Sequence, residues 1–323
     1  MVGMKLQKRY LVSFGVSVLI LLFLLTSVDI QQVVSILENA NMPYVIFGMF
    51  LTLMSISCKV IRWKFFLDAY KLKIKWSDVW SIFLAAHFLA NTTPARVGEA
   101  SRPYFLKRRY KTSYFHLLPT IILERVLDVL ILLVYSLVFL LFFYLFASFF
   151  IQMALLVITL ILLFVILVFF KRSIANYALS IFFRMFGFIR FISKLKPRAK
   201  RFIYNFYEGV TKVKSASFVK IIFFTALPWL IESFTFFIAA LSLGVNLPMI
   251  YCVGFISLAV LGGTLSSLPG GLGSTELILF GFLVFTGLSQ PMSLSITLLY
   301  RLMTFWTGAL LSAFFFLKEI NLK

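Results

Sequence analysis

Acidic residues, histidines and cysteines are scarce in this chain of 323 residues. It has 11 Asp and Glu compared with 31 Lys and Arg, and only two histidines and two cysteines. Cys58 and Cys252 have no histidine or second cysteine near them in sequence, which argues against the ligand clusters of zinc sites. The topology predicted below places them on opposite sides of a membrane, which argues against a disulfide. We expect no metal site and no cofactor.

Motifs that carry catalysis are missing as well. The sequence has no nucleophile elbow, no P-loop, no HExxH zinc motif and no dinucleotide-binding fingerprint. It also lacks a polar stretch long enough to form a soluble catalytic domain. We therefore expect that the protein is not an enzyme.

Apolar residues dominate the rest of the chain. They make up 62% of it, Phe alone contributes 40 residues, and the mean hydropathy is +1.02, whereas soluble domains are about 45–50% apolar. A span of the hydrocarbon core needs about 20 apolar residues. The sequence predicts an all-α, polytopic integral membrane protein with about six transmembrane helices, over 10–28, 43–61, 116–140, 149–170, 221–243 and 291–317.

Two further apolar stretches, 77–90 and 277–288, are too short for a full crossing. The first lies between segments 59–75 and 96–111, which are both rich in Lys and Arg. Because positively charged loops stay in the cytoplasm, the chain between them must enter the membrane and return on the same side. This predicts a re-entrant helical hairpin with its tip at 93–96.

The second short stretch belongs to a segment, 249–288, whose flanks carry no Lys or Arg. This segment predicts another re-entrant hairpin, entered from the outside, with its tip at 269–271. The same rule predicts a cytoplasmic (cell) membrane protein with both termini in the cytoplasm. Arg62 and Trp63 are interpreted as interfacial anchors.

An internal repeat supports this topology. Both tips read Pro-x-x-apolar-Gly followed by Glu, at 94–99 and 269–276, and an Arg follows that Glu after 26 residues in one copy and 25 in the other. We predict a single membrane domain, 1–323, with a first repeat over 1–148 and an inverted second repeat over 149–323. Inverted repeats with broken helices are typical of transporters.

A basic segment, 171–217, interrupts the second repeat. Between Lys171 and Lys220 there are twelve Lys and Arg against one acid, Glu208, with apolar residues interleaved. This predicts interfacial helices on the cytoplasmic leaflet, where each basic side chain contributes about 1 kcal/mol at an anionic surface. The segment serves either as a topology anchor or to recruit specific lipids. Basic clusters that flank apolar spans argue against nucleic-acid binding.

Charged residues inside the predicted membrane segments are the candidates for function. Each costs at least about 2.5–3.5 kcal/mol at the bilayer centre, so it must be paired or face a polar cavity. One interpretation is structural ion pairing, for example Arg301 with Glu276. The other is a functional site, because three Arg against five acids would leave carboxylates free to titrate or to bind a cation. These eight residues are Arg96, Glu99, Glu124, Arg125, Asp128, Glu232, Glu276 and Arg301.

The two tips add a possible anion site. Helices should restart near Gly98 and Ser274, and a helix N-terminus offers free N–H groups that suit a phosphate. Arg96 and Arg301 would reinforce such a site, whereas the glycines could instead serve close helix packing. His87, before the first tip, is either a packed side chain or a proton relay.

Three stretches together resemble a known family. Pro-x-Arg-x-Gly-Glu-x-x-Arg at 94–102, Leu-Glu-Arg-x-x-Asp at 123–128 and Pro-Gly-Gly-x-Gly-x-x-Glu at 269–276 are similar to the transmembrane region of lysylphosphatidylglycerol synthases, over about residues 8–318. The resemblance implies lipid movement between leaflets, while a separate soluble domain attaches the amino acid. That domain does not follow in this sequence, so we expect no lysyl transfer. The resemblance implies most of the candidate site residues, and Glu232 is added to them because it is a buried charge. The candidate site residues are Arg96, Gly98, Glu99, Arg102, Glu124, Arg125, Asp128, Glu232, Gly271, Gly273, Glu276 and Arg301.

The predicted function is therefore a flippase for a phospholipid or a lipid-linked glycan. Its partners would be membrane lipids with anionic or phosphate-bearing head groups, and a lipid-modifying enzyme could associate with it. Two alternatives stay open: a secondary transporter of a small polar solute, and a non-catalytic membrane partner of a glycosyltransferase or lipid synthase.

Overall fold

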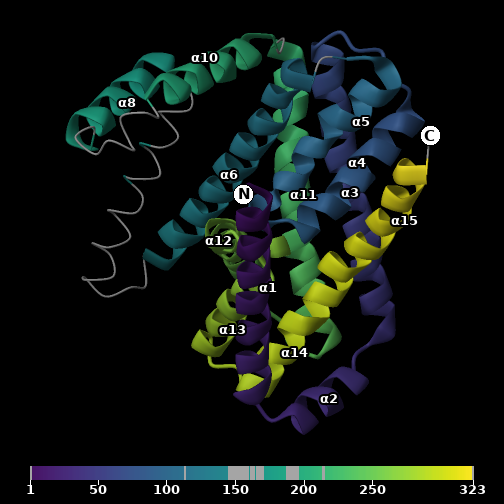
Figure 1. Cartoon of the computed structure of the whole chain (residues 1–323). Coiled ribbons are helices and arrows are strands. Elements are labelled where there is room, and N and C mark those ends of the chain that lie inside the picture. Colours follow the sequence, from purple (N-terminus) through teal and green to yellow (C-terminus); the bar gives the residue numbers. More distant parts are fainter. Residues whose placement is uncertain are drawn as a thin grey trace.

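A computed structural model describes residues 2–112, 114–144, 160, 164, 171–186, 196–212 and 215–321 (Figure 1). Every regular element in this part of the chain is a helix. Five of these helices are long and apolar enough to cross a membrane, or six if the bent pair at the N-terminus counts as one span. The predicted all-α polytopic membrane fold is confirmed. The predicted span 149–170 lies outside the described residues, apart from 160 and 164.

The elements follow one another as α1 (Val2–Thr26), α2 (Ile30–Glu38), α3 (Met42–Ala69), α4 (Trp76–Thr92), η1 (Pro94–Ala100), α5 (Ser101–Tyr110), α6 (Tyr114–Tyr144), α8 (Arg172–Phe186), α10 (Lys196–Lys212), α11 (Ser215–Ser242), α12 (Met249–Ser266), η2 (Pro269–Gly271), α13 (Ser274–Phe285), α14 (Gln290–Arg301), η3 (Leu302–Trp306) and α15 (Thr307–Asn321).

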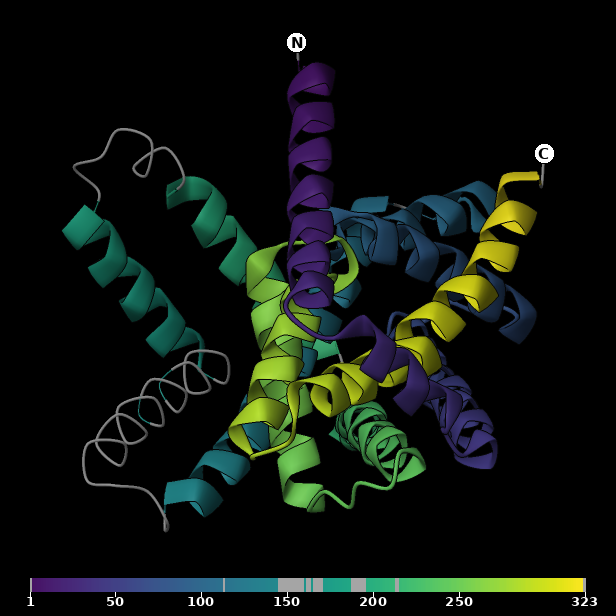
Figure 2. The same ribbon diagram turned by 90° about the horizontal axis from the view of Figure 1, so that it is seen from below.

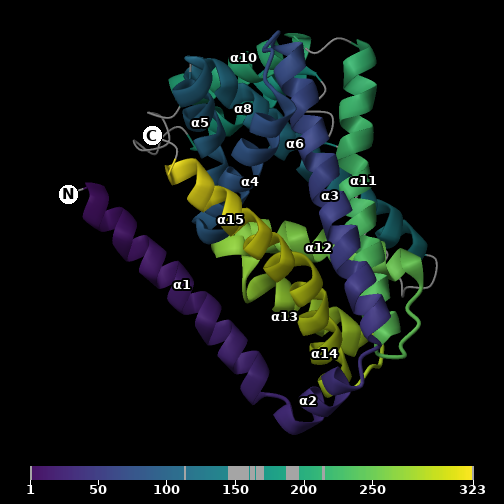
Figure 3. The ribbon, with the colours of Figure 1, turned by 90° about the vertical axis from the view of Figure 1, so that its right-hand side faces the viewer.

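Helix α2 lies between the predicted spans 10–28 and 43–61 and is not among the predicted helices. Asp29 caps α2, because its carboxylate accepts the N–H groups of Gln31 and Gln32. The chain bends by 87° between α1 and α2. Helix α2 closes one end of the bundle, while the N-terminal end of α1 and the C-terminal end of α15 point toward the other end (Figure 3).

Helices α3 and α11 pack side by side and form the spine of the bundle (Figure 3). Small residues, such as Ala239 and Ala240 on α11 and Ala259 on α12, let helices approach closely. Phe236 and Tyr300 fill the space that remains, with their rings edge to face at 5.3 Å between centroids. A second buried cluster, which includes Trp63 and Phe83, is formed mainly by residues of α3, α4 and α5.

Both predicted tips are true breaks in helices. Helix α4 ends at Thr92 and Thr93 is extended, as expected for a residue before proline. The second break begins at Ser267, and Gly270 and Gly271 there have φ of 59° and 66°, a region that glycine enters without steric cost. Elements η1 and η2 contact each other, so the two breaks meet inside the bundle.

The positions at which the helices resume are partly as predicted. Helix α13 begins at Ser274, as expected, whereas α5 begins at Ser101 because the 3₁₀ turn η1 occupies the residues around Gly98. Helices α4 and α5 lie toward the end of the bundle that holds α10, and α13 lies toward α2 (Figure 3). Helix α12, with 18 residues, is itself long enough to cross a membrane. Re-entry from opposite faces, and with it the inverted repeat, stays a prediction.

The last predicted span is one long helical segment with a local defect. It runs over Gln290–Asn321, but a π-helical turn, Leu302–Trp306, follows directly after Arg301. Thr307 donates its hydroxyl to the Leu302 carbonyl at 2.9 Å, five residues back. Such π turns often occur at functional sites because they shift the side chains beside them.

The basic segment forms the helices that the sequence analysis predicts. Helices α8 and α10 pack against each other, and α10 also contacts α6. Together they project from one side of the bundle (Figure 2). Their placement on a membrane surface stays a prediction.

A buried ion pair joins α3 to α6. The Arg62 guanidinium contacts Asp128 through two nitrogen–oxygen pairs at 2.5 and 3.3 Å, and its Nε lies 3.8 Å from Glu124. Trp229 on α11 donates to the same Asp128 carboxylate at 3.2 Å. Arg62 is 0% exposed and Trp63 is 1% exposed. Their interpretation as interfacial anchors is therefore wrong, because α3 continues two turns beyond the predicted end at residue 61.

Replacing Gly98 by alanine should destabilise the protein. A Cβ at this position would lie 2.2 Å from the Leu89 carbonyl carbon and 2.6 Å from the Ala90 nitrogen. Because both contacts are with backbone, η1 would have to move, at a cost of about 1–3 kcal/mol. Gly281→Ala is the matched control, since nothing lies within 4 Å of its Cβ. The melting temperature of the detergent-solubilised protein should fall only for Gly98→Ala; equal values would contradict this packing.

Replacing Arg62 by methionine should destabilise the protein more strongly. It leaves the Asp128 carboxylate buried without its main cation, which typically costs about 3–5 kcal/mol. Lys64→Met on the same helix is the control, because the side chain of its partner Asp68 is 50% exposed and such pairs contribute less than about 1 kcal/mol. The same melting measurement compares the two variants. A smaller loss for Arg62→Met than for Lys64→Met would count against the buried pair.

Labelling of introduced cysteines should test the first hairpin. In a background with Cys58 and Cys252 replaced by serine, Lys73→Cys before α4 and Lys107→Cys in α5 should both react with a membrane-impermeant maleimide from the same side of the membrane. Both lysines are exposed. Reaction from opposite sides would show that the chain between them crosses the membrane rather than returning.

Candidate functional site

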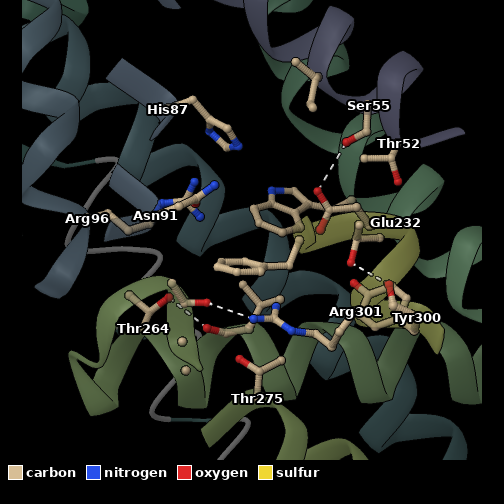
Figure 4. A pocket seen from close by; sticks show the side chains of 18 of the residues that line it. Thr52, Ser55, His87, Asn91, Arg96, Glu232, Thr264, Thr275, Tyr300 and Arg301 are labelled. Atoms are coloured by element: carbon tan, nitrogen blue, oxygen red, sulfur yellow. Dashed lines mark hydrogen bonds between the residues drawn. The ribbon is translucent and has the colours of Figure 1, made fainter. Parts of the chain in front are cut away.

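A cavity of about 120 Å³ lies where the two helix breaks meet (Figure 4). Its walls come from α3, α4, α11, α12, α13 and the segment from α14 into η3, and both η1 and η2 contribute to it. Residues far apart in sequence, such as Ser55, Arg96, Glu232 and Arg301, therefore face one space. Among the described residues, no three His, Cys, Asp or Glu side chains come together as a metal site.

Three cations but one acid line the cavity. The cations are Lys59, Arg96 and Arg301, and the acid is Glu232. Lys59 Nζ lies 2.5 Å from Glu232 Oε1, which also accepts the Ser55 hydroxyl at 3.2 Å. The Lys59 ammonium lies over the Trp229 ring, 4.7 Å from its centroid. The pair between α3 and α11 thus leaves the lining with a positive surplus.

Arg301 is fixed against the second break. Its Nε lies 2.6 Å from Glu276 Oε1, its Nη2 donates to the Gly270 carbonyl at 3.3 Å, and its guanidinium lies 4.5 Å from the centroid of the Phe305 ring. The other oxygen of Glu276 accepts the Gly273 N–H at 2.7 Å. Glu276 therefore caps α13 and holds Arg301 toward the cavity at the same time.

Arg96 stands at the first break in a strained conformation. Its φ is 54°, a region that residues with a Cβ rarely adopt. Its Nε donates to Glu99 Oε1 at 3.2 Å, and its side chain is 30% exposed. Backbone strain of this kind is typical of functional sites. Here it orients the guanidinium into the cavity (Figure 4).

Behind Arg96 lies a dense network of ion pairs. Glu99 is 2.9 Å from Arg125 and 3.7 Å from Arg102. Arg102 reaches Glu124 at 2.5 Å, and Arg125 reaches Asp128 at 3.0 Å. These contacts connect η1, α5 and α6. The network adjoins the cavity through side chains that line both, namely Lys59, His87, Arg96 and Trp229.

The sequence analysis expected more acids than bases among the buried charges, and this expectation is wrong. Each of the five acids named in the sequence analysis has a basic partner, and three cations that were left out of that balance, Lys59, Arg62 and Arg102, raise the basic side to six. Lys59 and Arg62 were assigned to a cytoplasmic loop segment, whereas α3 carries them inside the bundle. The surplus is therefore positive and favours an anionic ligand over a cationic one.

The structure also does not provide the anion site that was expected at the helix N-termini near Gly98 and Ser274. The Gly98 N–H donates to the Thr93 hydroxyl at 2.8 Å, and the Gly273 N–H donates to Glu276. Neither N–H group is free for a ligand, and a carboxylate at the start of α13 would repel an anion there. Gly98 serves close packing instead. Binding of an anion would rest on the side chains of Lys59, Arg96 and Arg301.

The structure thus sorts the predicted site residues into three groups. Lining the cavity are Arg96, Glu232, Gly271 and Arg301; in the adjoining network are Glu99, Arg102, Glu124, Arg125 and Asp128; in neither group are Gly98, Gly273 and Glu276. The sequence analysis missed the lining residues Lys59, Asn91 and Thr275. Lys59 could have been predicted as a buried helix residue, because no helix-ending signal separates it from the apolar run before it. No nearby feature of the sequence marks Asn91 or Thr275 as lining residues.

Comparison with known proteins agrees with the predicted resemblance. The model of the lysylphosphatidylglycerol synthase TM region family matches residues 10–312. The UPF0104 membrane protein PH1989 of Pyrococcus horikoshii is 25% identical, and the alignment covers 98% of both chains. The UPF0104 membrane protein MJ1595 of Methanocaldococcus jannaschii is 24% identical over 90% of this chain and 89% of that one. Because the family match spans both helix breaks and the whole cavity lining, this multi-pass integral membrane protein belongs to the lysylphosphatidylglycerol synthase TM region family.

Proposed function

We propose that the protein moves a lipid with a phosphate-bearing head group between the leaflets of the cytoplasmic membrane, without covalent chemistry. One observation carries this proposal: cations from three separate elements line one cavity where the two helix breaks meet, and the single acid in the lining is already paired with one of them. Keeping surplus positive charge inside a membrane protein is costly. An anionic ligand would offset that cost.

Arginine suits such a ligand. Its guanidinium offers several N–H donors in a plane and matches the oxygens of a phosphate. Arg96 and Arg301 each use Nε for a carboxylate. The Nη atoms of Arg96 have no hydrogen-bond partner among the described residues, and those of Arg301 reach only the Gly270 carbonyl. Both side chains can therefore bind a phosphate without giving up their present pairs.

Apolar side chains beside the cavity favour a lipid over a water-soluble solute. Val97, next to Arg96, is 63% exposed, and Leu265, next to the lining residue Thr264, is 85% exposed. In a membrane protein such exposed apolar side chains face acyl chains. A head group could thus enter the cavity from the side while its tails stay in lipid. The runner-up, transport of a small polar solute, would call for polar side chains at these positions.

Glu232 differs from the other buried acids in its partners. Two other buried acids, Glu124 and Asp128, are held by buried arginines of the ion-pair network. Glu232 instead faces the cavity with one lysine and one serine hydroxyl as partners. A phosphate that binds Lys59 would compete with Glu232 for that cation.

A second candidate function is that of a membrane partner for a soluble enzyme. Between α8 and α10 lies a groove lined by Arg172, Lys196, Lys200 and Arg201, with no acid among its lining residues. A soluble enzyme with an acidic surface would fit this groove. In that case Arg301 would have no role in activity, whereas substitutions in the groove would reduce it.

Reconstitution into liposomes tests these alternatives. With fluorescent phospholipids, wild type should accelerate exchange between leaflets, and both Arg301→Ala and Glu276→Gln should slow it about tenfold or more, since a hydrogen bond to a charged group contributes about 1.5–3 kcal/mol. Arg172→Ala in α8 is the control and should keep the wild-type rate. Equal rates for wild type, cavity variants and empty vesicles would overturn the proposal. Melting temperatures of all variants exclude loss of folding as the cause.

A further inference from the structure

We infer that the groove between α8 and α10 binds the head group of a membrane lipid that ends in a phosphomonoester, a phosphate with one ester bond only. Among the described residues, this groove shares no lining residue with the cavity between the helix breaks. Its ligand is therefore additional to the one proposed for the cavity and does not depend on it. Figure 2 shows the two helices beside the bundle.

Four basic side chains line the groove, namely Arg172 on α8 and Lys196, Lys200 and Arg201 on α10. None of these side chains forms an ion pair or a hydrogen bond with another described residue. Lys196 and Lys200 are one helical turn apart, and like charges at this spacing destabilise a helix. An anion between the two helices would remove that repulsion.

Arg172 is oriented by an aromatic ring on the facing helix. Its guanidinium lies over the ring of Tyr204, 5.1 Å from the centroid. This contact leaves the N–H donors at the edge of the guanidinium plane available for a phosphate. Asn176 and Ser180 also line the groove and follow Arg172 at intervals of four residues, so they share its face of α8. Their amide and hydroxyl groups add donors for phosphate oxygens.

The size and lining of the groove suit an amphipathic ligand. Its volume is about 580 Å³, within the range of about 300–1,000 Å³ that is usual for small-molecule sites. Leu179 and Phe183 give it an apolar part, and Phe183 is 8% exposed. The basic side chains can therefore bind a head group while the apolar part contacts the start of an acyl chain.

The neighbouring spans place the groove at the level of the head groups. Helix α10 ends at Lys212, and α11 begins at Ser215 and holds the candidate span Phe218–Ser242. At the other end, Arg172 follows directly after the predicted span 149–170. Because each helix adjoins the end of a membrane span, both lie near the surface of the bilayer.

An exposed apolar side of α8 favours a lipid over the acidic protein surface considered above. Tyr177, Ile181 and Met185 are exposed, and their spacing of four residues places them on the side of α8 away from Arg172. At a membrane surface such side chains contact acyl chains. A soluble acidic protein in the groove would leave this side uncovered, whereas lipid covers it and also supplies the anion.

The number of cations indicates the class of head group. A phosphomonoester carries about −1.5 to −2 charges near pH 7 and has three oxygens free to accept hydrogen bonds. A phosphodiester head group carries a single negative charge and would leave most of the basic side chains unmatched. Arginine and lysine both form strong, charge-assisted hydrogen bonds with phosphate oxygens. The groove is therefore expected to prefer phosphatidic acid to phosphatidylglycerol.

Protection of a cysteine in the groove tests this preference. With Cys58 and Cys252 replaced by serine, the exposed Ser180 is changed to cysteine, and the protein is placed in phosphatidylcholine nanodiscs. Adding phosphatidic acid should slow the reaction of Ser180→Cys with an uncharged maleimide. Phosphatidylglycerol at equal surface charge should slow it much less. Lys107→Cys on α5, outside the groove, is the control and should react at the same rate throughout.

Substitutions separate the groove from the cavity. Lys200→Gln with Arg201→Gln should lower the affinity for phosphatidic acid about tenfold or more, because two charge-assisted hydrogen bonds are lost. Lys71→Gln with Lys73→Gln removes the same charge outside the groove and should keep the affinity. Arg301→Ala should also keep it, even if lipid movement is lost. Melting temperatures of all variants exclude loss of folding.

Three results would overturn the inference. Equal protection by both anionic lipids would show a diffuse attraction to negative surface charge instead of a phosphomonoester site. An unchanged affinity in Lys200→Gln with Arg201→Gln would place the lipid elsewhere. Protection of Ser180→Cys by soluble polyglutamate, with none by either lipid, would assign the groove to an acidic protein. None of these results bears on the proposed movement of lipid through the cavity.

Discussion

The need to neutralise ionised side chains inside an apolar bundle governs this structure. Arg62, with no exposed surface, joins α3 to α6 through Asp128 and Glu124. From there the pairs continue through Arg102 and Glu99 to the first helix break. Each member would be expensive to bury alone, but as a network the charges hold α3, α5, α6 and η1 in one arrangement. The helix breaks can be irregular because this network and the core around Trp63 support them.

The candidate site is formed by charged side chains that lie next to the ion-pair network and face the cavity. Its pairs neutralise the acids behind the cavity, while Lys59, Arg96 and Arg301 face the cavity with Glu232 as the one acid in the lining. Glu276 has two roles, because its carboxylate caps α13 and also orients Arg301. The same separation explains why substitution of a network residue should affect stability first, whereas substitution of a lining residue should affect ligand binding.

Much of this could be predicted from the sequence, and the errors have physical causes. The breaks at Pro94 and Pro269 follow from local chemistry, since proline and glycine restrict or release the backbone at their own positions. The α2 helix was missed because an Asp cap and nine residues give a weak periodic signal. The charge balance came out with the wrong sign because Lys59 and Arg62 were assigned to the cytoplasmic segment 59–75, although α3 carries both inside the bundle.

The sequence by itself determined that the protein is a multi-pass membrane bundle, where its helices break, and which family it resembles. Apolar run length, proline and glycine act locally and can be read from neighbouring residues. Only the tertiary structure decided that the two breaks meet, that the buried acids are all paired, and that Asn91 and Thr275 line a shared cavity. Those features depend on which residues, distant along the chain, lie within a few ångströms of each other, and such distances exist only once the helices have packed.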